Sequence, residues 1–153
     1  MEVSVEIPLD PSGFMRRECP TCERQFKWFP GGTADKPDDF ADPETYFCPY
    51  CGVPSGTDNW ATSAQIEYAQ SVAMGVAMEQ IGEELRDTLG SSRSRGFKLK
   101  VSGFEAPSAQ SPPHDPDDMI MVEPPCHPFE PLKVSDEWSE TLHCLICGRV
   151  FRV

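Results

Sequence analysis

The sequence predicts an α+β fold in which two small, metal-held β modules are joined by one long α-helix. Pairs of cysteines in C-x-x-C turns occur near both ends of the chain, and a Pro-free stretch rich in Ala, Gln, Glu and Met lies between them. The 16 prolines among 153 residues argue against one large apolar core. We expect the first module at 1–60, the helix at 61–90, a strand and Pro-rich linker at 91–118, and the second module at 119–153.

The first module carries two cysteine turns, one with Cys19 and Cys22 and one with Cys48 and Cys51. A C-x-x-C turn directs two sulfurs at one point, and two facing turns complete a tetrahedron around Zn²⁺. Gly52 directly follows the second turn and can adopt the positive φ that often follows a metal-binding turn. Cysteines of an ordinary core have no reason to recur at this spacing. The four cysteines therefore predict a zinc site.

The residues around these turns resemble the zinc-ribbon and rubredoxin-like class. The resemblance consists of the two Cys-Pro-x-Cys turns, the aromatic pair Tyr46-Phe47 before the second turn, and the acidic, Pro-containing loop at 35–44. The resemblance covers about a quarter of the chain. The chain differs from rubredoxins at Glu23, where they have Gly, and it continues to residue 153, whereas rubredoxins end soon after the second turn. The resemblance implies a zinc-ribbon fold around the site, and it leaves zinc or iron open as the metal.

A second zinc ribbon is predicted at the C-terminal end, where the strand, cysteine turn, strand pattern recurs around Cys144 and Cys147. Cys126 supplies a third ligand. The fourth ligand is open between His127, in a Pro-bounded bend beside Cys126, and His143, beside Cys144. A site with three ligands or an empty site is a further alternative. We prefer His127, because a turn with two ligands normally faces another corner with two ligands. The prediction is thus two Zn²⁺ per chain and no other cofactor.

Short strands are expected where apolar and polar residues alternate, or where the chain enters and leaves a cysteine turn. The acidic loop at 35–44 lacks the spacing of an EF-hand, so its carboxylates are interpreted as solvated rather than as calcium ligands. The expected strands are 3–7, 14–18, 25–29, 97–101, 119–123, 132–134, and the residues on both sides of the third cysteine turn.

The helix is expected over 62–89, with Thr62 or Ser63 as the N-cap and Gly90 at its C-terminal end. Its apolar residues follow two stripes at helical spacing. We expect the first stripe to pack on the first module, and the second to face the second module, another copy of the chain or a different protein. One wide core-facing surface is the alternative. The first stripe is Ile66, Ala69, Ala73 and Val76; the second is Met74, Met78, Ile81, Leu85 and Leu89.

Charge and cysteine usage limit the function classes. Thirteen Lys and Arg against 25 Asp and Glu give a net charge of −12, which argues against a general nucleic-acid binder and favours protein partners. Six of the seven cysteines fall in three C-x-x-C pairs, which is typical of reduced, metal-binding thiolates in the cytoplasm. The sequence shows neither a signal-peptide pattern at its start nor a stretch long enough to span a membrane.

We find no sequence motif of an enzyme: neither a Walker A loop, nor G-x-S-x-G, nor H-E-x-x-H, nor the H-x-E of zinc deaminases. The sequence therefore favours a non-enzymatic protein-interaction or adaptor module that binds a protein partner or forms a homo-oligomer through 62–89. One alternative is a nucleic-acid-binding zinc ribbon that uses the basic residues Arg16, Arg17, Arg24, Lys27 and the block 93–100. Another is electron transfer by rubredoxin-type iron.

Overall fold

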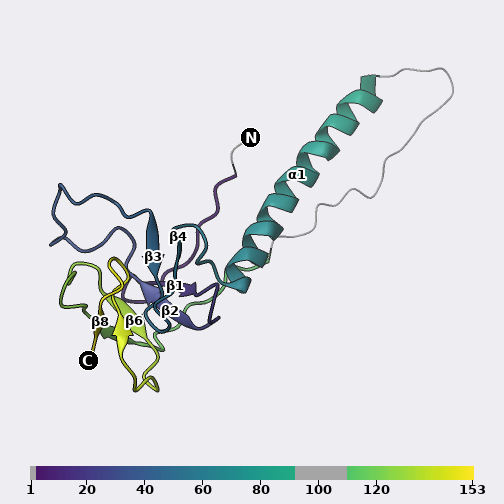
Figure 1. Cartoon of the computed structure of the whole chain (residues 1–153). Helices are drawn as coiled ribbons and strands as arrows, with labels where there is room; N and C mark the ends of the chain where they lie inside the picture. Colours follow the sequence, from purple (N-terminus) through teal and green to yellow (C-terminus); the bar gives the residue numbers. More distant parts are fainter. Residues whose placement is uncertain (1–2, 92–109) are drawn as a thin grey trace. The chain divides into compact units, whose positions relative to one another are not determined.

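The computed structural model describes residues 3–91 and 110–153, with the backbone alone for 89–91 (Figure 1). The chain divides into two compact units. The helical unit consists of Met1–Glu6 and Ala64–Pro113, and the β unit consists of Ile7–Ser63 and His114–Val153. The β unit therefore combines segments from both halves of the chain, and the class is α+β as predicted.

A four-stranded antiparallel sheet forms the centre of the β unit. Its strands are β1 (Met15–Glu18), β2 (Gln25–Trp28), β5 (Ile120–Val122) and β6 (Leu132–Val134), in the order β1-β2-β6-β5. The segments expected to form two separate ribbons thus share one sheet, because β2 pairs with β6.

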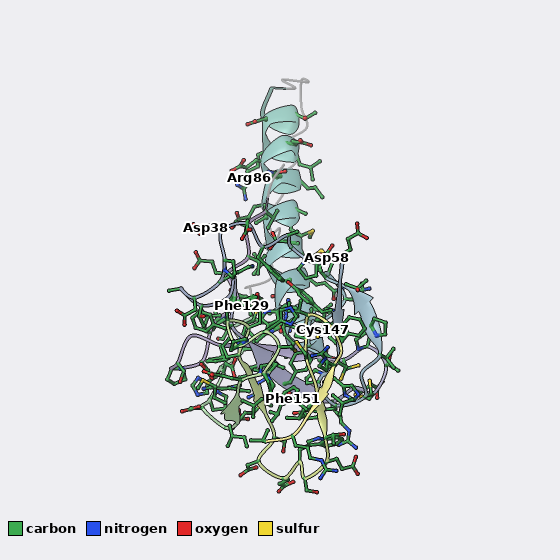
Figure 2. The ribbon with its side chains drawn as sticks, turned by 60° about the vertical axis from the view of Figure 1, so that its left-hand side comes forward. Asp38, Asp58, Arg86, Phe129, Cys147 and Phe151 are labelled. Atoms are coloured by element: carbon green, nitrogen blue, oxygen red, sulfur yellow. The ribbon has the colours of Figure 1, made fainter. Side chains whose placement is uncertain are left out.

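Two small hairpins complete the β unit. One pairs β3 (Thr45–Phe47) with β4 (Pro54–Gly56), and the other pairs β7 (Leu142–His143) with β8 (Val150–Phe151). Each hairpin encloses one cysteine turn. Figure 2 labels Cys147, at the end of the turn between β7 and β8, and Phe151 on β8.

The core of the β unit is largely aromatic. Phe26 and Trp60 are fully buried, with ring centroids 5.7 Å apart in an edge-on arrangement. The hydroxyl of Tyr50 donates to the carbonyl of Gln25 at 2.8 Å and accepts from the N–H of Ser135 at 3.0 Å. Tyr50 therefore ties the second cysteine turn to β2 and to the residue that follows β6. Further buried apolar residues are Val122, Leu132, Val134, Leu142, Leu145 and Phe151.

Two lysines face each other inside the sheet, since Lys27 on β2 lies opposite Lys133 on β6. Like charges placed directly opposite on a sheet repel. Asp10 lies between them, with its Oδ2 3.1 Å from the Nζ of Lys27 and 2.8 Å from the Nζ of Lys133. The side chains of Asp10 and Lys27 are 0% exposed, so this pairing is what permits both charges to be buried.

An irregular segment supplies the remaining carboxylates. The Oδ1 of Asp115 lies 3.0 Å from the Nζ of Lys27, and the Oδ1 of Asp117 lies 2.9 Å from the Nζ of Lys133. The Nζ of Lys27 also donates to the carbonyl of Pro116 at 2.5 Å. The last residues of the Pro-rich linker are therefore tied to the sheet by one buried ion pair, that of Asp115, and by one whose carboxylate, that of Asp117, is half-exposed.

The single helix of the described residues, α1, spans Ser63–Ser91. It begins directly after Thr62, which occupies the N-cap position, and it continues past Gly90, where we expected it to end. The predicted strand at 3–7 is wrong: these residues are irregular, because no described strand pairs with them. The predicted strand at 97–101 lies outside the described residues.

Both predicted stripes of α1 include exposed apolar side chains. Ile66 from the first stripe is 46% exposed, and Met74, Ile81 and Leu85 from the second are 57%, 46% and 37% exposed. Met78 is half-buried. The described part of the chain thus leaves large apolar side chains of this helix in contact with solvent.

Candidate metal centres

Three cysteine turns of the β unit share one backbone conformation. The first cysteine of each turn donates its N–H to the carbonyl five residues later, which closes the turn. These bonds run from Cys19 to Arg24 at 3.0 Å, from Cys48 to Val53 at 3.2 Å and from Cys144 to Arg149 at 2.9 Å. Shared hydrogen bonding shows that the three C-x-x-C sequences fold locally in the same way.

Each turn ends with a residue in the left-handed region. Gly52 has φ 72° and Gly148 has φ 71°, as the sequence predicted for Gly52, whereas the equivalent residue of the first turn is Glu23 with φ 61°. Each of these residues donates its N–H to the carbonyl of the first cysteine of its turn, at 2.9 to 3.0 Å. A non-glycine residue in this conformation is strained by about 1 kcal/mol. The departure at Glu23 from the rubredoxin pattern thus leaves the turn geometry unchanged.

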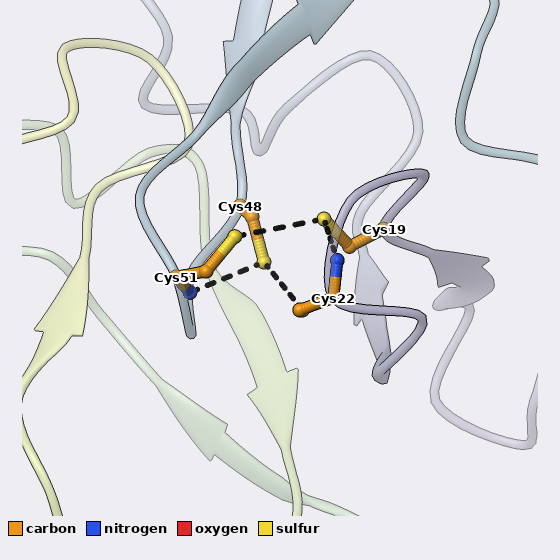
Figure 3. A group of neighbouring side chains, drawn as sticks. All are labelled: Cys19, Cys22, Cys48 and Cys51. Atoms are coloured by element: carbon orange, nitrogen blue, oxygen red, sulfur yellow. Dashed lines mark hydrogen bonds between the residues drawn. The ribbon is translucent and has the colours of Figure 1, made fainter.

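The first cluster brings together Cys19, Cys22, Cys48 and Cys51, whose sulfurs all lie within 4.8 Å of one another. Figure 3 shows the turns of Cys19 and Cys48 facing each other, with 3.7 Å between the sulfurs of Cys19 and Cys51 and between those of Cys22 and Cys48. Zn–S bonds of about 2.3 Å in a regular tetrahedron place the sulfurs about 3.8 Å apart. The spacing of the four thiols therefore fits a tetrahedral ion.

Backbone N–H groups point at the first sulfur of each turn. The N–H groups two and three residues after Cys19 donate to its sulfur at 3.3 and 3.4 Å, and those after Cys48 at 3.4 and 3.5 Å. Burial opposes ionisation of Cys19, but these N–H groups lower the pKa of its thiol. At the more deeply buried Cys48, burial dominates and raises the thiol pKa. A divalent cation is what would stabilise all four groups as thiolates.

The second cluster contains Cys126, His127, Cys144 and Cys147, whose ligand atoms also lie within 4.8 Å of one another. The sulfurs of Cys126 and Cys147 are 3.4 Å apart, and the Nδ1 of His127 lies 3.4 Å from the sulfur of Cys144. Burial raises the pKa of Cys144 to about 12. Two ligands come from the turn between β7 and β8, and two from the bend between β5 and β6.

The two candidate histidines occupy different environments. The ring of His127 packs edge-on against Phe40 and Phe129, with centroids 5.9 and 5.7 Å away. The Nδ1 of His143 lies 3.3 Å from the carbonyl oxygen of Pro49, so this ring contacts the turn of the first cluster. The structure therefore brings His127, and not His143, to the sulfurs of the second cluster.

The turns of Cys48 and Cys144 pair with each other in a reciprocal way. The N–H of Phe47 donates to the carbonyl of Leu145 at 2.9 Å, and the N–H of His143 donates to the carbonyl of Pro49 at 2.9 Å. In both bonds the donor precedes the first cysteine of one turn, and the acceptor follows the first cysteine of the other. The two clusters are thus joined by matched backbone contacts.

Side chains repeat this reciprocal arrangement. A Cβ added at Gly148 would lie 2.7 Å from the ring of Phe47, and one added at Gly52 would lie 2.7 Å from the ring of His143. Each glycine is therefore required for its positive φ and for the ring that packs on it. Neither cluster can lose its turn without disturbing the contacts of the other.

Both donor sets fit Zn²⁺, which takes four Cys or Cys and His ligands in structural sites. Four protein ligands fill a tetrahedron and leave no position for water or substrate, so an ion here would crosslink the fold. Within residues 3–91 and 110–153, these are the groups of three or more potential ligands that could hold a metal ion.

Comparisons with known proteins give no relative of this chain: no family model matches it, and neither a curated protein nor a solved structure matches it. In the described part of the chain, no helix combines the length and apolar character needed to cross a membrane. The geometry of the two clusters is therefore the basis for a functional assignment.

Substitution of the candidate fourth ligand tests the composition of the second cluster. His127→Ala should release the second metal ion, because three thiolates leave the tetrahedron open, and the coupling of the two turns should then weaken binding of the first ion as well. His127→Cys should retain both ions. His143→Gln serves as the control and should keep both ions. Titration with a chromophoric zinc chelator measures the number of tightly bound ions. Loss of one ion from the His143 variant, with two retained by His127→Ala, would reverse the assignment.

Proposed function

We propose that this chain is a non-enzymatic protein-interaction module whose β unit is held together by two structural zinc ions. The observation that carries the proposal is that each cluster offers four protein ligands within 4.8 Å. A catalytic zinc typically keeps one coordination position for water or substrate. A closed site contributes folding free energy instead, about 10 kcal/mol or more for structural zinc.

The basic residues of the β unit support a protein partner over nucleic acid. Lys27 is 0% exposed and ion-paired, and Arg16 pairs with Asp118. The guanidinium of Arg17 stacks on Trp28, with 4.5 Å from its carbon to the ring centroid. These cations are engaged within the chain, and a net charge of −12 repels phosphate. The block 93–100, which lies outside the described residues, is what sustains the nucleic-acid alternative.

The surface we assign to the partner is the apolar face of α1 formed by Ile66, Met74, Ile81 and Leu85. These residues are 37–57% exposed, and apolar side chains recurring along one helix are typical of helix-mediated association. Methionine suits such a surface, because its flexible thioether adapts to a partner. The partner is a different protein or a second copy of the chain.

A double substitution on this face tests the proposal. Met74→Glu with Ile81→Glu should leave helicity and both metal ions intact, because both side chains are exposed, and should abolish association. Gln70→Glu with Gln80→Glu adds the same charge at exposed polar positions of the same helix and should change nothing. Analytical ultracentrifugation measures self-association, and quantitative affinity capture compares partner recovery among the three proteins.

Two results would count against the interaction proposal. One is unchanged self-association and partner recovery in the Met74 and Ile81 variant. The other is submicromolar binding of generic duplex DNA at physiological salt that weakens steeply as salt is added, which would favour the nucleic-acid alternative.

A further inference from the structure

The β unit has an open cleft of about 420 Å³ beside strand β2. None of the candidate ligands of the two clusters lines it, although Leu145 of the third cysteine turn contributes to its wall. Its lining combines aromatic rings with carboxylates and one lysine. The side chains that matter are Trp28, Phe29, Lys36, Asp42, Tyr46 and Glu130.

Glu130 is a buried carboxyl group whose negative charge is only weakly balanced by a nearby cation. It is 7% exposed, and its Oε1 lies 3.6 Å from the Nζ of Lys36, which is longer than a charge-assisted hydrogen bond. Burial raises the pKa of Glu130, and Lys36 acts in the opposite direction. A buried carboxylate with one distant cation gains free energy when a closer cation reaches it.

Three weak contacts hold the ammonium of Lys36: the long pair with Glu130, a pair with Asp42, and the ring of Phe40, whose centroid is 5.5 Å away. The Nζ of Lys36 lies 3.3 Å from the Oδ1 of Asp42, but the side chain of Asp42 is 88% exposed, so solvent screens this pair. Lys36 also lies on the loop at 33–43, which has no regular secondary structure. A competing cation can therefore displace this ammonium at small cost.

The aromatic wall favours a planar cation. The rings of Trp28 and Tyr46 lie with centroids 4.9 Å apart at 55°, and Arg17 already stacks on Trp28. In the same unit, Arg24 lies over Trp138 at 4.9 Å. A guanidinium can stack on an aromatic face while its N–H groups form a bidentate pair with a carboxylate, which an ammonium cannot do.

We propose that this cleft binds an arginine side chain of a protein partner, with the guanidinium paired to Glu130 and stacked on Tyr46 in place of the Lys36 ammonium. The chain's charge of −12 attracts basic partners to this surface. The inference rests on the proposed interaction function and names the chemistry that the partner must present. It concerns a surface separate from the face of α1, so the two proposals can fail independently.

The test uses the full-length, metal-loaded chain and the blocked tripeptide acetyl-glycyl-arginyl-glycinamide, with binding followed by NMR at the Trp28 indole and the Gly31 amide. We expect saturable shifts of these signals with a millimolar Kd. The matched citrulline peptide, which is nearly isosteric but neutral, should bind at least about tenfold more weakly, and the lysine peptide should also bind more weakly.

Two variants identify the groups involved. Glu130→Gln should weaken binding of the arginine peptide about tenfold, whereas Glu44→Gln, which removes an exposed carboxylate, should not change it. Lys36→Ala should strengthen binding severalfold, because the competing cation is gone; this variant decides the matter if Glu130→Gln does not fold. Absence of saturable shifts, equal binding of the citrulline or lysine peptide, or unchanged affinity in Lys36→Ala would overturn the proposal.

Discussion

Replacing Cys144 with serine is expected to release both metal ions and to unfold the β unit. Cys144 is a fully buried candidate ligand of the second cluster. The residues on both sides of it form backbone hydrogen bonds with the turn of Cys48 and the residue before that turn. Loss of the second ion removes on the order of 10 kcal/mol of metal-linked folding free energy, comparable with the whole stability of a small domain. Strands β5 and β6 then lose the crosslink to β7, and the shared sheet loses two of its four strands.

Chelator titration and far-UV circular dichroism measure this outcome. Ser139→Ala, which changes an exposed residue of the same segment, is the control. It should keep both ions and the circular dichroism spectrum of the folded chain. A Cys144→Ser protein that stays folded and holds one ion as tightly as the unmodified chain would show that the two turns are energetically independent, contrary to their reciprocal contacts.

Asp10→Ala is expected to destabilise the β unit by about 3–5 kcal/mol, because it leaves Lys27 and Lys133 buried and facing each other with too little negative charge. The substitution also removes the carboxylate oxygen that accepts the N–H groups of Ser12 and Phe14, each at 2.9 Å. Urea unfolding at neutral pH with saturating zinc measures the change. Asp38→Ala, in the exposed acidic loop, should alter stability by less than about 0.5 kcal/mol.

The pH dependence of this effect has a defined sign. Burial by itself raises the pKa of Asp10, but hydrogen bonds from Lys133, Phe14 and Lys27 lower it to about 2, below its ordinary 3.8. A carboxyl group with a lowered pKa in the folded state stabilises the fold above its unfolded pKa, and that stability is lost only as pH falls toward about 2. The difference between the unmodified chain and Asp10→Ala should thus be constant from about pH 6 to pH 8. A difference under about 1 kcal/mol, or one that vanishes in this range, would contradict the role of Asp10.

The features that depend on the spacing of neighbouring residues, namely the cysteine turns and the helix, could be predicted from the sequence. A C-x-x-C turn is defined by a few consecutive residues, so all three turns and their flanking short strands could be located in advance. The helix was also predictable, because Thr62 marks its start and the stretch up to Gly90 lacks proline. The sequence favours His127 over His143 only because a turn with two ligands normally faces a second segment that also supplies two. The structure places His127 beside Cys144.

The joining of distant segments was not predictable. Strands of two to four residues carry too little alternation to specify a partner, so nothing in the sequence paired β2 with β6. Nothing near Lys27 or Lys133 in the sequence indicates that these lysines are buried, and their carboxylate partners come from distant positions, 10 and 115–118. The alternation at 3–7 predicted a strand, but a strand also requires a neighbour, which these residues lack among those described.

Whether two zinc ions hold the β unit together is decided by the metal content of the folded chain, measured by native mass spectrometry together with elemental analysis of aerobically purified protein. We expect the mass of the 153-residue chain with two zinc ions, and a charge-state distribution typical of a folded protein. A well-folded chain without metal, or a red protein with iron in the cluster of Cys19, Cys22, Cys48 and Cys51, would show that structural zinc does not hold this fold.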